Sequence, residues 1–527
     1  MKTGRISRSG RVASAALAVA VLASTAGISA AASASAASPS GGGVPGGGML
    51  NVVDVGTQWP GLDVATDPQD AADGDFMNAI YGQLFELAPG NKVIPDEATG
   101  YKFSNNFETV TINLRHGLKF SNGDPFTAAD VAWSINRDLL PANANIGDVN
   151  FPVKGQVKAT GPYTVVADLT RPDSAFIHAF LNEAPNWTAD EKAVAAMGEK
   201  AYAMKPIGAG PFVVVSNAPS SKLVLKKNPN YWQKGAPHLS GITFTAVGTD
   251  QSAASALQSG EAQLGQLIST IPLLQQLKSD GLTVTDPPST LTQFISLNEQ
   301  NGPFKSIKAR EAVAYATDAA ALTDKLYHGA YPVVEDQSAP GQEFYQQKNK
   351  AYPAYDLAKA KSLVRQLGGL SVNLSTTTNT GYWTTEVEAL ATMWEAAGIK
   401  VNIQDNTLQQ MLQITFNHTW QAIDSNWGGN IDPSINDPQF FEGGAAFSGV
   451  NDPTLNSLFN ASASTSSNAA RTKIFKQINT REDQQVDAVW LYSKAFFDVS
   501  TKDLVKSSGL TNNMSVIRWE DLGVRGA

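Results

Sequence analysis

The sequence of 527 residues contains no cysteine. This absence excludes disulfide bonds, thiolate zinc sites, a cysteine nucleophile and a lipidated cysteine anchor. Histidine is scarce, and no two of the five histidines stand four residues apart, as metal ligands on one helix face do. We therefore expect neither a metal nor a cofactor. The histidines are His116, His178, His238, His328 and His418.

Basic residues are outnumbered by acidic ones, 39 against 48, which gives a formal charge of −9. This balance argues against general nucleic-acid binding. The chain also lacks the His-Glu-x-x-His, Gly-x-Ser-x-Gly and Walker motifs. We expect no enzymatic activity, although a pair of carboxylates acting in a secreted hydrolase stays an alternative. The length exceeds what one hydrophobic core usually supports, so two or three domains are expected.

The first 37 residues predict an exported protein. They open with scattered Lys and Arg, continue with an apolar run from Ala15 to Ile28, and end in small residues that fit a cleavage site at 32–36. A leader retained as a membrane anchor is the alternative to cleavage. Residues 38–48, SPSGGGVPGGG, have the composition of a flexible linker.

The stretch from Thr109 to Arg137 predicts a strand, a turn and a helix. Apolar and polar residues alternate over 110–114, which is typical of a half-buried strand. Asn122-Gly123 favours a turn. Thr127 is placed as a helix N-cap, with Asp130 three residues on as its acidic partner.

Similar patterns predict other elements along the chain. A strand, a helix and a second strand over 370–403 form a βαβ unit. Two glycines in Pro206–Phe212 allow a tight backbone crossing. The further expected strands are 49–55, 163–169, 222–225 and 292–298, and the further expected helices are 78–86 and 249–260.

The string LRHGLKFSNGDPFTAADVAWSINR resembles the signature of the family 5 solute-binding proteins of ABC importers, the dipeptide, oligopeptide and nickel-binding group. That signature reads Leu-Arg-x-Gly-x-x-Phe-x-x-Gly-x-Pro-x-Thr-Ala-x-Asp-Val, and every fixed position is kept here. Three more blocks resemble the family: Pro206–Phe212, Asn228–Pro237 and Pro303–Asp318.

The resemblance implies an α/β fold of the periplasmic-binding-protein-like, cluster C type, with two lobes built from three domains and a ligand cleft between them. On this basis we divide the chain as follows: signal peptide 1–37, linker 38–48, domain I 49–80, domain II 81–204, domain I again 205–290, domain III 291–498, and the last part of domain I 499–527.

The resemblance also implies a function. The protein is expected to act outside the cytoplasm or at the cell surface as a monomer, to capture a small solute by hinge closure, and to deliver it to an ABC permease. An oligopeptide and an oligosaccharide are both open as the solute. A ligand-sensing receptor on the same fold is an alternative to transport.

The expected ligand site centres on Trp427. Peptide-binding relatives have a Trp here, followed three residues later by an aspartate that pairs with the peptide's amino group. This chain has Asn430 at that position. An amide does not neutralise an ammonium but does pair with hydroxyls, so the exchange favours a neutral polyol. Asp432 is a substitute only if the loop shifts, since Asp432-Pro433 matches a turn of the family.

Four more residues complete the expected ligand site. Trp59 follows the first strand, Tyr382 and Trp383 precede a predicted helix, and Asn426 stands beside Trp427. Indole faces stack on sugar rings, which is why these aromatic residues are candidates.

Overall fold

The computed structural model describes residues 44, 46–66, 73–88, 92–140, 143, 151–285, 289–346, 351–377, 381–427, 430–445, 447–506 and 517–525. The chain separates into residues 1–43 and 44–527, and all that follows concerns the second part. No helix among its described residues is long and apolar enough to cross a membrane.

A seven-stranded sheet organises the first lobe, in the order β12-β18-β11-β1-β10-β9-β8. Its strands are β1 (Met49–Val55), β8 (Phe212–Ala218), β9 (Lys222–Lys227), β10 (Gly241–Val247), β11 (Leu264–Ile268), β12 (Thr283–Thr285) and β18 (Phe497–Ser500). Side chains alternate across β1, so Val52 packs with the core that contains α1 (Asp73–Tyr81), and Val53 packs with α6 (Asp250–Ser259) and α7 (Ile271–Ser279).

An insertion between β1 and β8 carries its own sheet, in the order β4-β5-β7-β6. The helix α2 (Ala128–Asp138) covers it, and the Asp130 carboxylate accepts hydrogen bonds from the N–H and hydroxyl of Thr127, as predicted. The insertion contains β2 (Phe85–Ala88), β3 (Lys92–Pro95), β4 (Ala98–Ser104), β5 (Thr109–Leu114), β6 (Lys158–Gly161), β7 (Thr164–Asp168), α3 (Phe176–Ala179), η2 (Phe180–Asn182), η3 (Ala184–Asn186), α4 (Glu191–Met197) and α5 (Glu199–Met204).

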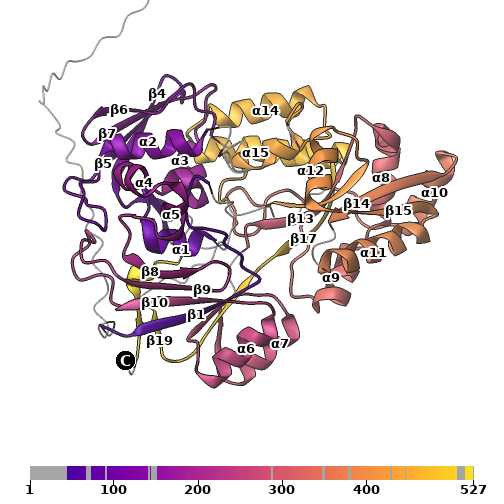
Figure 1. Ribbon diagram of the computed structural model, residues 1–527. Helices are drawn as coiled ribbons and strands as arrows, with labels where there is room; N and C mark the ends of the chain where they lie inside the picture. The colour runs from indigo at the N-terminus through magenta and orange to yellow at the C-terminus, as the bar shows by residue number, and fades with distance from the viewer. Residues whose placement is uncertain are drawn as a thin grey trace, which may run out of the picture. The chain divides into compact units, whose positions relative to one another are not determined.

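A five-stranded sheet, β15-β14-β16-β13-β17, organises the second lobe. Its strands are β13 (Leu291–Leu297), β14 (Leu370–Thr377), β15 (Ile399–Asn406), β16 (Ala422–Trp427) and β17 (Ala488–Lys494). The predicted βαβ unit is confirmed, because β14 and β15 are parallel and joined by α11 (Gly381–Ala396) (Figure 1).

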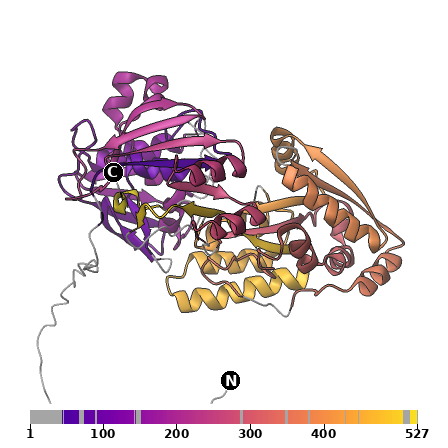
Figure 2. The same ribbon diagram turned by 90° about the horizontal axis from the view of Figure 1, so that it is seen from below.

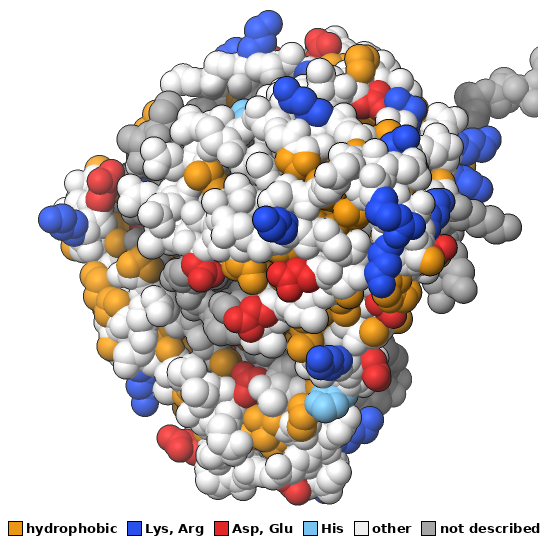
Figure 3. All heavy atoms as spheres, turned by 90° about the vertical axis from the view of Figure 1, so that its right-hand side faces the viewer, with side chains coloured by type: hydrophobic (Ala, Val, Ile, Leu, Met, Phe, Trp, Pro, Cys, Tyr) orange, Lys and Arg blue, Asp and Glu red, His pale blue; other side chains and the backbone are white. Residues whose placement is uncertain are grey.

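Helices cover both faces of the five-stranded sheet. One face holds α8 (Ile307–Ala316), α9 (Ala319–Tyr327), α10 (Leu357–Gln366) and α11. The other holds α14 (Pro453–Ala463) and α15 (Asn468–Gln485), which pack on Phe294 and Trp490 (Figure 2). The side that carries α8 and α10 shows interspersed acidic and basic side chains (Figure 3). The remaining elements are η4 (Gly302–Lys305), α12 (Leu408–Phe416), η5 (Pro433–Ile435), α13 (Asp437–Phe441), β19 (Leu504–Lys506), η6 (Trp519–Asp521) and β20 (Leu522–Val524).

The helix predicted over 78–86 is wrong in its second half. The structure ends α1 at Tyr81 and starts β2 at Phe85. Gly82 between them has a φ of +74°, a left-handed conformation that stops a right-handed helix. The apolar residues on either side fit the helical period only by coincidence, because each belongs to a different element.

The two lobes are joined by two chain crossings. The chain leaves the seven-stranded sheet at the end of β12 and enters the five-stranded sheet at β13; it returns from β17 to β18 across two residues, Ala495 and Phe496. In each sheet, the two crossings therefore join at one edge, which we call the crossing edge.

Candidate functional site

In the five-stranded sheet, the parallel strands end at the same edge at which the two crossings connect to the sheet. There, β14 and β16 are parallel, and Trp427 at the end of β16 pairs with Thr292 at the start of β13. Lys494, the last residue of β17, pairs with Leu291 at the same edge. In open α/β sheets, ligands bind outside the carboxyl ends of the strands.

The seven-stranded sheet has the same arrangement at its own crossing edge. Strands β1, β10 and β11 are parallel, and Ile268 at the end of β11 pairs with Phe497, where the returning chain begins β18. Both crossings therefore connect the carboxyl-end edge of one sheet with the carboxyl-end edge of the other. This is the edge at which a ligand site is expected in each lobe.

Four predicted site residues stand at the crossing edge of the five-stranded sheet. Asn426 and Trp427 end β16, while Tyr382 and Trp383 open α11 directly after the segment that follows β14. Asn426 is half-buried and pairs in register with Gln293. The side chains of Tyr382, Trp383 and Trp427 lie outside what the structure describes.

Asn430 is buried in the turn after β16. Its side-chain N–H donates to Asn436 Oδ1 at 3.1 Å, and its backbone carbonyl accepts from Gln342 Nε2 at 2.9 Å. Its side-chain oxygen has no hydrogen-bond partner within the described part of the chain. The side-chain oxygen of Asn430 is thus available to accept a hydrogen bond.

Both carboxylate oxygens of Asp432 are engaged by protein groups. Arg471 donates to them at 2.5 Å and 2.8 Å, and the hydroxyl of Ser434 donates at 2.7 Å. Burial by itself would raise the pKa of Asp432, but the charge and hydrogen bonds of Arg471 hold that pKa below its usual value. Asp432 is therefore an ionised residue that holds the start of η5.

The loop that Asp432 holds also contacts the insertion. Ile431 and Ile435 belong to the same apolar cluster as the sheet of β4 to β7. The backbone N–H of Ser174 donates to the carbonyl of Ala463 at 2.8 Å, and Arg171 pairs with Glu442 at 3.3 Å. These contacts tie the second lobe to the insertion.

Trp59 is fully buried in the first lobe rather than open to solvent. Its indole N–H donates to Asn217 Oδ1 at 2.9 Å, and its ring packs against Phe76 at 5.4 Å between ring centroids. Trp59 follows β1 at the carboxyl-end edge, so it supports that edge from inside.

Sequence reasoning missed a buried polar cluster beside Asn426. Gln293 Nε2 donates to Asp424 Oδ1 at 2.6 Å. Glu386 of α11 accepts at one oxygen from the hydroxyls of Tyr492, at 2.5 Å, and Tyr327, at 3.0 Å. The sequence signals were a carboxylate, Asp424, in the middle of a short strand and another, Glu386, on the buried face of a helix.

Burial shifts the pKa of all three ionisable groups in this cluster. Burial, and then the neighbouring Glu386, raise the pKa of Asp424 well above its usual value; burial also raises the pKa of Glu386. Lys494 is the nearby cation, and burial lowers its pKa to about 8 despite the attraction of Glu386, Asp250 and Asp424. Two buried carboxyls with raised pKa values therefore lie near a buried ammonium with a lowered pKa.

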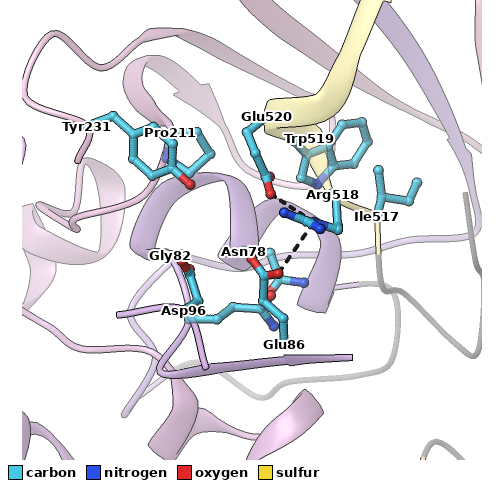
Figure 4. Close-up of a pocket in the computed structure, with 11 residues that line it drawn as sticks. Asn78, Gly82, Glu86, Asp96, Pro211, Tyr231, Ile517, Arg518, Trp519 and Glu520 are labelled. Atoms are coloured by element: carbon cyan, nitrogen blue, oxygen red, sulfur yellow. Dashed lines mark hydrogen bonds and ion pairs between the residues drawn. The ribbon is translucent and has the colours of Figure 1, made fainter. Parts of the chain in front are cut away.

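A separate small recess lies in the first lobe, where β2 meets the C-terminal segment (Figure 4). Arg518 lies between Glu86, at 3.4 Å, and Glu520, at 3.1 Å. Burial, and then Glu520, raise the pKa of Asp96 to about 7. The recess is lined by Asn78, Gly82, Gln83, Glu86, Asp96, Pro211, Tyr231, Ile517, Arg518, Trp519 and Glu520. It contains none of the predicted ligand residues.

A metal ion has no prepared site in the described part of the chain, where no group of three or more His, Cys, Asp or Glu residues is placed to hold one.

Known proteins are similar to this chain in sequence. The glutathione-binding protein GsiB of Salmonella typhi is 32% identical over 317 residues, and that of Escherichia coli O157:H7 is 31% identical over the same length. Each match covers 60% of this chain and 61% of the relative, so it spans less than two thirds of either.

Solved structures share the fold. The Helicobacter pylori protein DppA, in complex with the peptide STSA, is 20% identical with a TM-score of 0.76, over 91% of this chain and 98% of that one. AgaA from A. tumefaciens R10, in complex with agropinic acid, is 20% identical with a TM-score of 0.76, over 91% and 99%. AppA of Bacillus subtilis, in complex with a nonapeptide, is 18% identical with a TM-score of 0.75, over 92% and 100%.

A family model covers more than half of the chain, residues 92–449, and includes the signature block and the βαβ unit. The relatives are solute-binding proteins and not enzymes, and they give the hydrolase alternative no support. With its two mixed sheets and their paired carboxyl-end edges, this chain belongs to the bacterial extracellular solute-binding proteins, family 5.

Proposed function

We propose that this protein works outside the cytoplasm as a monomer, captures a small solute between its two lobes by hinge closure, and delivers it to an ABC importer permease. The observation that carries the proposal is the match to the family over residues 92–449, combined with two crossings that join the carboxyl-end edges of the two sheets. Those edges are where a ligand is expected.

The solute is a small polar molecule in this proposal. Relatives bind glutathione, peptides and agropinic acid, and these are the first candidates. An oligosaccharide stays a second candidate because Asn430 is neutral and keeps a side-chain oxygen without a partner in the described residues.

In this proposal Trp427, Asn426 and Asn430 contact the solute, together with Tyr382 and Trp383 at the start of α11. Asp432 and Trp59 do not contact the solute in this proposal and act as structural residues. Asp432 holds the turn through Arg471, and Trp59 supports the edge of the seven-stranded sheet from the core.

Mass spectrometry of the solute that co-purifies with the native protein tests the proposal directly. A thermal-shift panel of peptides, glutathione, opines and oligosaccharides then tests it with known compounds. A solute at 100 times its dissociation constant stabilises the folded state by about 2.7 kcal/mol. Absence of any bound solute together with no shift from the whole panel would contradict capture, and turnover of a peptide or glycoside would favour a hydrolase.

A further inference from the structure

The two lobes are joined by a third contact besides the crossings, and this one is not covalent. It lies between the residues before α3 in the insertion and the end of α14 in the second lobe (Figure 1). The backbone N–H of Ser174 donates to the carbonyl of Ala463 at 2.8 Å, and its hydroxyl donates to the carbonyl of Ser462 at 3.2 Å. The last carbonyls of an α-helix have no partner within the helix. Ser174 therefore supplies hydrogen bonds from one lobe to the end of a helix in the other.

An apolar contact lies next to these hydrogen bonds. Ile431, before η5, and Ile435, at its end, are 1% and 7% exposed. Both belong to the apolar cluster of the insertion, together with Phe176 and Ile177 of α3. The η5 turn packs against both α3 and α14. Because separation of the lobes would return this apolar surface to water, the two isoleucines favour the contact.

An ion pair at the rim adds little to the contact. Arg171 pairs with Glu442 at 3.3 Å, with 46% and 19% of the two side chains exposed, and exposed ion pairs stabilise weakly. The contact therefore depends on Ser174 and on the two isoleucines. The buried pair of Asp432 with Arg471 holds η5 on the second lobe, so the insertion meets a surface that its own lobe keeps in shape.

The position of this contact relates it to closure. An opening rotation about the two crossings separates the insertion from α14, because they belong to different lobes, and so it breaks the contact. The residues that form the contact are different from those expected to touch the solute, which are Tyr382, Trp383, Asn426, Trp427 and Asn430. The contact therefore needs no solute to form.

We propose that this contact is a latch, in which Ser174 and η5 hold the two lobes together independently of the solute, so that the solute-free protein rests mainly closed. The inference rests on the proposed function and deepens it by naming what regulates closure. A solute then enters during openings of the latch. Because the latch favours the closed form, it raises the affinity for a solute and slows its exchange.

The absence of cysteine from the chain allows a direct test in the full-length protein. Arg171→Cys combined with Glu442→Cys places one thiol on each lobe at the rim, where the ion pair that is lost contributes little. The protein is freed of solute by unfolding and refolding from urea and is then treated with a short bismaleimide. We expect rapid crosslinking within one molecule and the same radius of gyration in solution scattering before and after the reaction. The two single variants control for crosslinks between molecules.

Two further changes in the same reporter locate the latch. Ser174→Pro removes both the N–H and the hydroxyl, and it should slow crosslinking by about 10-fold and increase the radius of gyration, since two hydrogen bonds are lost. Ser174→Ala removes only the hydroxyl and should have a smaller effect. If Ser174→Pro does not melt cooperatively, Ile435→Ala replaces it, with Ile307→Ala as the control at an isoleucine that is 38% exposed and lies on α8.

The outcomes separate this inference from the proposed function. A radius of gyration that falls on crosslinking, or a crosslinking rate that neither Ser174→Pro nor Ile435→Ala changes, would overturn the latch and leave solute capture standing. A latched protein that co-purifies with no solute and shows no thermal shift with peptides, glutathione, opines or oligosaccharides would overturn solute capture and, with it, the role of the latch in closure.

Discussion

Arg471 donates to both carboxylate oxygens of Asp432 while only 3% and 0% of the two side chains are exposed. The pair comes from α15 and from the start of η5, so it fastens the loop after β16 to the helices beneath it. Because that loop also packs on the insertion through Ile431, the pair connects the crossing edge of the five-stranded sheet with α15 and with the insertion.

Arg471→Met should destabilise the folded state by about 3–5 kcal/mol, because it leaves the Asp432 carboxylate buried without its cation. Urea denaturation measures the change. Lys158→Ala is the control, since Lys158 pairs with Asp168 at 3.9 Å on the surface, where 65% and 45% of the side chains are exposed. That variant should cost at most about 1 kcal/mol. Equal costs in the two variants would contradict the role of Arg471.

The backbone at Gly210 crosses close to the end of α1, and the addition of one methyl group tests how tight this contact is. A Cβ on Gly210 would lie 2.5 Å from the backbone nitrogen of Gly82. Gly210→Ala should therefore destabilise the protein by about 1–3 kcal/mol through overpacking. Gly161→Ala is the matched control, because a Cβ there meets nothing within 4 Å. A melting temperature unchanged in Gly210→Ala would show that the crossing has room to relax.

These glycines illustrate which parts of the fold the sequence could predict. The glycines of Pro206–Phe212 indicated a close crossing, and a Cβ on Gly208 would indeed lie 2.4 Å from the carbonyl oxygen of Ile80. The Thr127 cap and the βαβ unit also followed from local patterns, because capping and strand alternation are set by neighbouring residues.

Contacts between distant segments could not be predicted in the same way. Gln293 and Asp424 are 131 residues apart, and Glu386 and Tyr492 are 106 residues apart. Nothing in the local sequence of either partner specifies the other. Trp59 is a further case. Its place after β1 suggested a ligand contact, but its indole N–H donates to Asn217, which is 158 residues away in the sequence, so its burial could not be predicted locally.

The recess beside the C-terminal segment predicts a pH dependence of stability. Burial raises the pKa of Asp96 to about 7, with Glu520 adding to the effect and Arg518 and Arg115 opposing it. The folded state therefore holds a proton that the unfolded chain releases above about pH 4. Stability contributed at this site is greatest below about pH 4 and falls as the pH rises toward about 7.

Asp96→Asn removes this dependence. The difference in free energy of unfolding between Asp96→Asn and the parent protein should move in favour of the variant from about pH 4 to about pH 7 and stay level above that. Urea denaturation across the pH range measures it, with Glu261→Gln as a control that removes an exposed carboxylate. A difference that is constant with pH would mean that Asp96 has the same pKa in the folded and unfolded states.

Trp427→Ala should weaken solute binding and leave cooperative melting intact. Trp427 ends β16 at the crossing edge, and in the proposed function its side chain contacts the solute. Trp394→Ala is the contrasting variant: Trp394 is fully buried, and its indole N–H donates to Thr317 Oγ1 at 2.9 Å. That substitution should cost about 3–5 kcal/mol of stability. Thermal melts with and without the co-purified solute separate the two effects, and a loss of cooperative melting in Trp427→Ala would place Trp427 in the core instead.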